Sequence, residues 1–176
     1  TGDTVITGIG QGSLLVTPLQ LAVATAMLAE HGKPVTPHLI LNTTQTGHKQ
    51  DGVTPSSTAW TTIDKAMQNV IKAPNGTATN FGKNFNYTVA GKTGTVQVFK
   101  KKSYKHMSQY LLPKKLRNNH LFIAFAPAKK PSIAIAVVVE HSSDADGIAR
   151  KFLDYYFKLE NQEKTNVQNG QKSRTK

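Results

Sequence analysis

Cysteine is absent from the 176 residues of the chain. This absence excludes disulfide bridges, thiolate metal ligands and a cysteine nucleophile. The six histidines are scattered along the chain, and no two have the four-residue spacing of a helical zinc site. We therefore expect neither a metal nor another cofactor.

Long apolar runs are also lacking. No segment approaches the roughly 18 consecutive apolar residues of a membrane-spanning helix. The polar start Thr1-Gly2-Asp3-Thr4 lacks the basic residues that begin a secretion signal. The hydrophobic content of 38% is nevertheless adequate for the core of one domain. We expect the chain by itself to be soluble.

Acidic residues are scarce, with 10 acids against 22 bases and a formal charge of +12. The excess is concentrated in the segment 100–117, which has seven bases and no acid, and in the tail 158–176. Such segments can contact nucleic acid, anionic lipid or an acidic polymer. Aromatic residues that could stack on bases are sparse there, with only Tyr104 and Tyr110. A solvated loop is therefore favoured, and no nucleic-acid partner is expected.

Helical and strand patterns follow one another in an order typical of a mixed fold. The Gly-rich segment 1–16 predicts a loop. Helical periodicity or capping signals predict helices at 18–31, 55–73 and 144–159, and β-branched or alternating residues predict strands at 35–41, 88–99, 119–126 and 132–139. Short links predict antiparallel pairing. The fold class is thus α/β of the α+β type, an antiparallel sheet with helices on both faces, in a domain 1–160 followed by a disordered tail 161–176.

Local signals fix some details of these elements. Thr17 is a good N-cap before Pro18, and Thr54 is the expected cap of the second helix. The strand 132–139 is apolar on both faces, which predicts burial on both faces, with its alanines allowing close approach of a helix. In the last helix Ile148, Phe152 and Tyr155 or Tyr156 are expected to face inward, and Asp144 and Asp146 to cap it.

The segment Ala90-Gly91-Lys92-Thr93-Gly94-Thr95 carries the chemistry. Glycines weaken a strand interior, and one reason to keep them is the close approach of an extended ligand. A lysine supplies charge for a carboxylate, threonine hydroxyls can donate to the same group, and a backbone N–H can stabilise an oxyanion. The triplet alone favours a plain edge strand or bulge with a solvated lysine. A phosphate loop is excluded, because no glycine lies five residues before Gly91 and no helix follows.

Lys-Thr-Gly is also one of three motifs of penicillin-binding proteins and serine β-lactamases. Beyond this triplet, the chain resembles class B penicillin-binding proteins over nearly all of 1–157, and its Ile-Gly-Gln-Gly form is most similar to the cell-elongation branch, penicillin-binding protein 2. The matching stretches, in family order and spacing, are Gly8-Ile9-Gly10-Gln11-Gly12, Thr17-Pro18-Leu19-Gln20-Leu21-Ala22, Pro37-His38, Asn75-Gly76-Thr77-Ala78, Gly91-Lys92-Thr93-Gly94-Thr95 and Asn119-His120-Leu121-Phe122-Ile123-Ala124-Phe125-Ala126-Pro127.

The resemblance implies a peptidoglycan D,D-transpeptidase that crosslinks stem peptides through an acyl-serine and is inhibited by β-lactams. It implies that Lys92 makes the site positive beside the serine, and that the hydroxyls of Thr93 and Thr95 hold the substrate carboxylate. It further implies that the Thr95 N–H forms half of the oxyanion hole and that Gly94 allows close approach. Gln97 is expected to border the pocket.

The other two motifs of the family are absent from this sequence. The one Ser-x-x-Lys match is Ser173-Arg174-Thr175-Lys176 in the polar tail, which is unsuited to hold a nucleophile. No Ser-x-Asn or Tyr-x-Asn occurs. The resemblance therefore implies that this chain is the C-terminal part of the domain, that the serine and two of five sheet strands come from upstream, and that this chain alone is inactive.

The resemblance also implies a place and partners. The place is the periplasmic face of the inner membrane, with an upstream anchor. The partners are stem peptides, the lipid-linked precursor, β-lactam antibiotics, the upstream half of the same protein and a membrane glycosyltransferase of the elongation machinery. Two alternatives stay open: a serine β-lactamase, and a penicillin-sensing or polymer-binding module without transpeptidase activity. His120 is expected to be structural, because no Ser-His-Asp pattern surrounds it.

Overall fold

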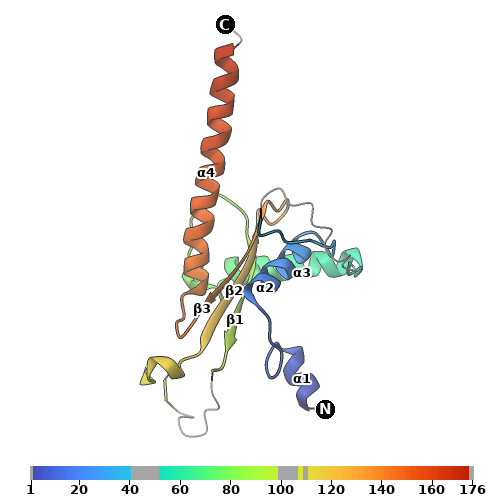
Figure 1. Cartoon of the computed structure of the whole chain (residues 1–176), viewed down its shortest axis with the longest axis vertical. Helices are drawn as coiled ribbons and strands as arrows, with labels where there is room; N and C mark the ends of the chain where they lie inside the picture. Colours follow the sequence, from blue (N-terminus) through green and yellow to red (C-terminus); the bar gives the residue numbers. More distant parts are fainter. Residues whose placement is uncertain (1, 41–51, 99–106, 109–110, 175–176) are drawn as a thin grey trace.

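The computed structural model describes residues 2–40, 52–98, 107–108 and 111–174, with side-chain detail to residue 167 (Figure 1). Helices, a three-stranded sheet and a long final helix follow one another along the chain. The elements are α1 (Gly2–Gly8), α2 (Pro18–Ala29), α3 (Ser57–Lys72), the 3₁₀ turn η1 (Thr79–Phe81), β1 (Ala90–Val96), the 3₁₀ turn η3 (Lys114–Leu116), β2 (Asn119–Ala126), β3 (Ile133–Val139) and α4 (Ala145–Arg174).

The three strands form an antiparallel sheet in the order β1-β2-β3. Lys92 lies opposite Ile123 across the first ladder, and Ala124 lies opposite Ile135 across the second. Antiparallel neighbours need only a short connection, which the six residues 127–132 provide between β2 and β3. Within the described part of the chain, β1 is therefore an edge strand, the position that the Lys-Thr-Gly triplet alone favours.

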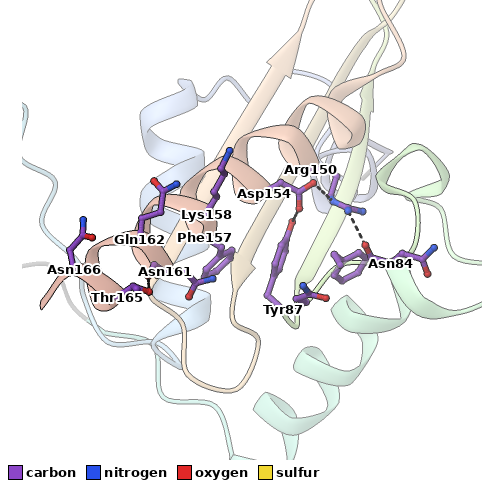
Figure 2. Close-up of a pocket in the computed structure, with 12 residues that line it drawn as sticks. Asn84, Tyr87, Arg150, Asp154, Phe157, Lys158, Asn161, Gln162, Thr165 and Asn166 are labelled. Carbon is purple, nitrogen blue, oxygen red and sulfur yellow. Dashed lines mark hydrogen bonds and ion pairs between the residues drawn. The ribbon is translucent and has the colours of Figure 1, made fainter. Parts of the chain in front are cut away.

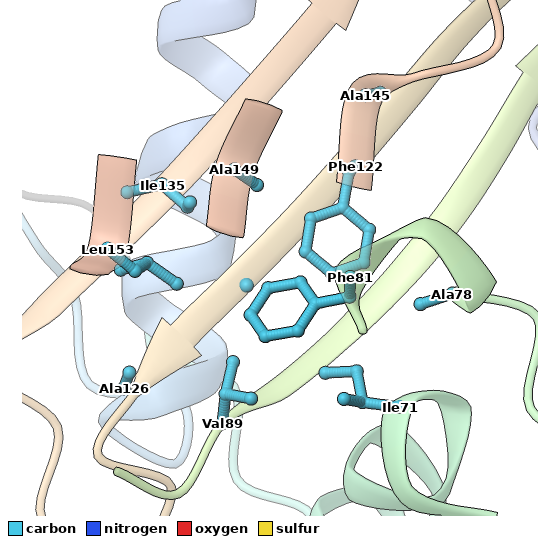
Figure 3. Packing of buried hydrophobic residues seen from close by; sticks show 11 residues of the cluster. Ile71, Ala78, Phe81, Val89, Phe122, Ala126, Ile135, Ala145, Ala149 and Leu153 are labelled. Carbon is cyan, nitrogen blue, oxygen red and sulfur yellow. The ribbon is translucent and has the colours of Figure 1, made fainter. Parts of the chain in front are cut away.

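Helices cover both faces of this sheet, which confirms the predicted fold class. On one face α4 packs over a cluster that includes Phe81, Phe122 and Leu153, all nearly or fully buried (Figure 3). On the other face Phe125 of β2 packs with residues of α2 and α3, among them Leu28 and Met67. The period-two alternation of β2 thus sends neighbouring side chains into two separate cores.

The caps of α2 and α3 show how local sequence starts these helices. Thr17 accepts from the Gln20 N–H at 3.2 Å while the Gln20 side chain accepts from the Thr17 N–H at 2.8 Å, a complete capping box before Pro18. This confirms the predicted start of α2. For α3 the cap is Ser56, whose hydroxyl accepts from the Ala59 N–H, so the predicted cap Thr54 is wrong by two residues.

The inward face of α4 differs from the predicted one. Ala145, Ala149 and Leu153 are buried, whereas Ile148 is 41% and Phe152 53% exposed. The helix turns Ala145 and Ala149 toward the sheet, where small residues let its backbone come close to the large rings beneath, and Leu153 packs in the same cluster. Tyr155 is likewise 62% exposed, so Ile148, Phe152 and Tyr155 form an exposed stripe on α4.

α4 also extends beyond its predicted end near Leu159. It continues to Arg174, so the segment 161–174 is helical rather than irregular. Pairs one turn apart support this extension: Lys164 binds Glu160 at 2.8 Å, and the Thr165 hydroxyl donates to the Asn161 carbonyl at 2.9 Å. The domain boundary at residue 160 stays a prediction.

Two other predictions for the N-terminal third differ from the structure. The segment 1–16, predicted to be a loop, contains the seven-residue helix α1, which stands apart from the layers and buries none of its residues (Figure 1). Asp3 in its first turn complements the helix dipole. The predicted strand 35–41 is absent from its described part, 35–40, where Pro37 removes a ladder donor. Half of the basic loop 100–117, namely residues 100–106 and 109–110, lies outside the described residues.

Candidate functional site

The Lys-Thr-Gly strand β1 presents alternate residues to the two faces of the sheet. Thr93 lies opposite Phe122 and Thr95 opposite His120, so both threonine side chains are on the face that carries α4. Lys92 lies opposite Ile123, on the face of α2 and α3. The lysine and the two threonines therefore flank the strand edge from opposite sides.

The backbone of β1 shows which peptide groups face away from β2. The Thr95 carbonyl accepts from Gln11 Nε2 at 2.7 Å, and the Thr93 carbonyl accepts from Lys92 Nζ at 2.7 Å. In an antiparallel strand the N–H and C=O of one residue point to the same side, and successive residues alternate. The N–H groups of Thr93 and Thr95 therefore also lie on the free edge, where an extended peptide can pair with them.

The charge of Lys92 is available to a ligand. Its side chain is exposed, and within the described ranges its ammonium forms no ion pair, only the hydrogen bond to the adjacent Thr93 carbonyl. An exposed ammonium beside free peptide N–H groups makes this edge attractive to a carboxylate. Gln97 lies just beyond the end of β1 and is exposed, so it continues the same edge.

The two glycines of β1 have different surroundings. A Cβ on Gly91 would lie 2.6 Å from Phe122 Cζ and 2.9 Å from the Ile123 carbonyl oxygen, so Gly91 makes room for a core ring. This is a packing reason, and it replaces ligand approach as the account of this glycine. A Cβ on Gly94 would lie 3.3 Å from Leu121 Cβ, a milder conflict, so its role toward a ligand stays a prediction.

Two residues that the sequence analysis did not assign to the site also contact β1. Gln11 donates to the Thr95 carbonyl, and the Thr77 hydroxyl lies 2.7 Å from the Thr93 hydroxyl. They are 84 and 16 residues away from their partners, beyond the reach of any local pattern. The signal that could have found them is their position in two of the stretches that carry the family resemblance.

A pocket lies away from β1, between the segment 84–87 and α4, with a volume of about 790 Å³ (Figure 2). The Tyr87 hydroxyl donates to Asp154 at 2.9 Å. Burial is the main cause that raises the pKa of Tyr87 above its usual range, and the carboxylate of Asp154 raises it further. Arg150 binds Asp154 at 2.7 Å and also donates to the carbonyls of Phe81 and Asn84. These contacts compensate the charges and tie the segment to α4, which is a structural role.

Within the described ranges, no helix is both long enough and apolar enough to cross a bilayer. The same residues bring no three histidine or acidic side chains together as a metal site. His120 lies half-buried in β2 opposite Thr95. The site that the geometry supports is therefore the edge of β1.

Comparison with known families gives one family match over most of the chain. Residues 1–154 match the model of the penicillin binding protein transpeptidase domain. Among curated proteins, the chain is similar to the peptidoglycan D,D-transpeptidase MrdA of Haemophilus influenzae, at 39% identity over 94% of this chain and 28% of that protein. It is also similar to MrdA of Acinetobacter baumannii, at 36% identity over 88% of this chain and 24% of that protein.

Solved structures agree with these matches. Penicillin-binding protein 2 of Pseudomonas aeruginosa, in complex with WCK 5153, is 36% identical with a TM-score of 0.67, over 87% of this chain and 31% of that one. Penicillin-binding protein 2 of Helicobacter pylori, in complex with MreC, is 33% identical with a TM-score of 0.68, over 90% of this chain and 28% of that one. The chain thus spans less than a third of the length of each of these relatives.

Proposed function

Because the chain belongs to the penicillin-binding protein transpeptidase domain family, we propose that it forms the Lys-Thr-Gly side of a peptidoglycan D,D-transpeptidase site. The observation that carries this proposal is the free edge of β1. Peptide groups of Thr93 and Thr95 point away from β2 there, beside the exposed ammonium of Lys92. An extended stem peptide ending in a carboxylate fits such an edge by strand addition.

The proposed reaction has two acyl-transfer steps. A serine oxygen attacks the carbonyl carbon of the penultimate D-Ala, the peptide bond breaks, and the terminal D-Ala leaves with a proton on its amine. The amine of a neighbouring stem peptide then attacks the acyl-serine ester, forms a new peptide bond and releases the serine. A β-lactam enters the first step, and its opened ring stays on the serine.

Each residue of β1 has a proposed part in these steps. Lys92 makes the site positive, which favours the carboxylate and the developing negative charge. The hydroxyls of Thr93 and Thr95 donate to the carboxylate, since both lie on one face of the strand. The Thr95 N–H on the free edge supplies one donor to the oxyanion, Gly94 leaves the ligand room, and Gln97 borders the bound peptide.

The serine is proposed to come from residues upstream of Thr1. The one Ser-x-x-Lys of this sequence begins at Ser173, close to the C-terminal end of α4. That end projects far beyond the sheet, on the opposite side of the molecule from the end of β1 (Figure 1). A nucleophile must lie within reach of the oxyanion donors, and this one does not.

Exposed apolar surface supports the same proposal. Ile148, Phe152, Tyr155 and Leu159 recur at four, three and four residues along α4, and each is at least 41% exposed. Their spacing places them on one helical face. Val138 of β3, the strand at the other edge of the sheet, is 39% exposed. Upstream strands and helices that complete the family fold would cover these surfaces.

Incubated alone with a fluorescent penicillin, this chain is expected to remain unlabelled after denaturing electrophoresis. The reason is that no positioned serine accompanies the Lys92 strand. The matched control is the intact protein, meaning this chain together with the upstream residues that carry Ser-x-x-Lys and Ser-x-Asn, which is expected to label. Stable fluorescence on the isolated chain, abolished by Ser173→Ala, would refute the proposed origin of the serine.

The isolated chain is also expected to aggregate or to melt without cooperativity, because its apolar stripe and sheet edges are uncovered. The intact protein is expected to be monomeric and to unfold cooperatively. Size-exclusion chromatography and calorimetry of the two proteins make the comparison. A monomeric isolated chain with a sharp melting transition would contradict the need for an upstream half.

The proposal extends to location and partners. The site would act at the periplasmic face of the inner membrane, held there by an upstream anchor. Stem peptides and the lipid-linked precursor would be its substrates, and a membrane glycosyltransferase of the elongation machinery would supply the glycan. The chain is similar to a penicillin-binding protein 2 that forms a complex with MreC, which supports an MreC-like protein as a further partner.

A further inference from the structure

The stretch Asn75-Gly76-Thr77-Ala78 carries part of the family resemblance, yet the proposed reaction gives it no role. We propose that Thr77 is a positioning residue, which orients the hydroxyl of Thr93 toward the carboxylate of the substrate. The proposal rests on the proposed function, because it acts through the carboxylate contact of Thr93. The observation behind it is the separation of 2.7 Å between the two hydroxyl oxygens.

The backbone around Thr77 is fixed on both sides. A Cβ on Gly76 would lie 2.4 Å from the Val70 carbonyl oxygen, so the turn after α3 admits only glycine at this position. The Ala78 N–H then donates to the same Val70 carbonyl at 3.0 Å, and the Ala78 side chain is 4% exposed in the core. Thr77 is therefore held between two anchored residues beside β1.

The hydrogen count of the two hydroxyls gives the contact a direction. A hydroxyl has one hydrogen to donate and can accept at its oxygen, whereas an ionised carboxylate only accepts. When Thr93 donates its hydrogen to a bound carboxylate, its contact with Thr77 requires that Thr77 be the donor. The result is a chain from Thr77 to Thr93 to the ligand, and hydrogen bonds in such a chain strengthen one another.

A loss of Thr77 would leave Thr93 in place but free to turn. Its hydrogen could then point to other acceptors, and part of the carboxylate contact would be lost. A role limited to holding the turn against β1 predicts something different: a change in stability without a change that depends on Thr93. The isosteric substitution Thr77→Val keeps the shape and removes the hydroxyl, and so separates the two roles.

The test uses the intact protein and the second-order rate constant of its acylation by a fluorescent penicillin. Thr77→Val is expected to lower this constant about 5- to 10-fold, the size of one hydrogen bond, with an unchanged melting temperature. Thr77→Ser, which restores the hydroxyl, is expected to stay within about twofold of the original protein. Thr79→Val, an exposed threonine two residues away, is the matched control and is expected to have no effect.

A double-mutant cycle identifies the route of the effect. In a Thr93→Val background, Thr77→Val is expected to have almost no further effect, whereas in a Thr95→Val background its effect is expected to persist in full. Three results would each overturn the positioning role: an unchanged acylation rate constant for Thr77→Val, an equal loss of rate for Thr77→Ser, or losses of rate that add when Thr77→Val is combined with Thr93→Val. If Thr93→Val itself leaves acylation unchanged, the proposed function of β1 fails instead, so the two failures are distinguishable.

Discussion

Replacement of Lys92 by methionine in the intact protein is expected to lower the acylation rate constant with a labelled penicillin by about 10²–10³-fold. Methionine keeps most of the length of the side chain and removes its charge. The ammonium of Lys92 is exposed beside the free peptide edge of β1, and it donates a hydrogen bond to the neutral carbonyl of Thr93. Its charge is therefore available both to the carboxylate and to the transition state, where the effect is largest.

The controls for this prediction separate charge from shape. Lys92→Arg keeps the charge in a bulkier, planar group and is expected to retain an intermediate rate. Lys129→Met removes one positive charge from the exposed turn between β2 and β3 and is expected to change the rate by less than about twofold. An unchanged rate for Lys92→Met, or equal losses for the two methionine variants, would show that Lys92 is not part of the site.

Most of the sheet and the start of α2 could be predicted because their causes are local. Thr17 and Gln20, three residues apart, satisfy the first turn of α2 by reciprocal hydrogen bonds, and Pro18 fits the first position of the helix. The strands β2 and β3 follow from alternation and from the short turn that joins them. An edge position for β1 is what its Lys-Thr-Gly triplet alone favours, and the sheet order of the described strands agrees with it.

The inward face of α4 could not be predicted from hydrophobicity alone. Two apolar stripes one residue apart compete on this helix, one of small residues with Ala145 and Ala149, the other of large residues with Ile148 and Phe152. Large apolar residues lose more exposed area when buried, so hydrophobicity alone predicts that they form the core face. The rings of Phe122 in β2 and Phe81 in η1 already fill the cluster beneath α4, which takes Ala145, Ala149 and one large residue of the helix, Leu153.

The candidate site was predicted in part for a related reason. Lys92, Thr93 and Thr95 could be proposed because alternation along one strand fixes how they lie relative to one another. Gln11 and Thr77 reach β1 through tertiary contacts, which no periodicity encodes. Gly91 shows the converse, since a residue that looked like an adaptation to a ligand is required by the ring beneath it.

Phe122→Ala is expected to give the largest loss of stability, about 3–5 kcal/mol in the free energy of unfolding of the transpeptidase domain. The ring is fully buried and its centroid lies 5.7 Å from that of the Phe81 ring (Figure 3). It also occupies the space that a Cβ on Gly91 would need. Its removal leaves a cavity that the surrounding sheet and α4 cannot fill. Calorimetry of the intact protein measures the change, and Phe122→Leu, which leaves a smaller cavity, is expected to lose less.

The contact between Phe122 and Gly91 supplies a second, internal test of this packing. Gly91→Ala alone is expected to destabilise the domain by about 1–3 kcal/mol, because its Cβ would lie 2.6 Å from the ring carbon Cζ of Phe122. In the Phe122→Ala background that ring is gone, so the same substitution is expected to cost much less. Strictly additive losses would show that Gly91 is constrained by something other than Phe122. In that case the Ile123 carbonyl oxygen, 2.9 Å from the same Cβ position, would be the constraint that requires glycine beside Lys92.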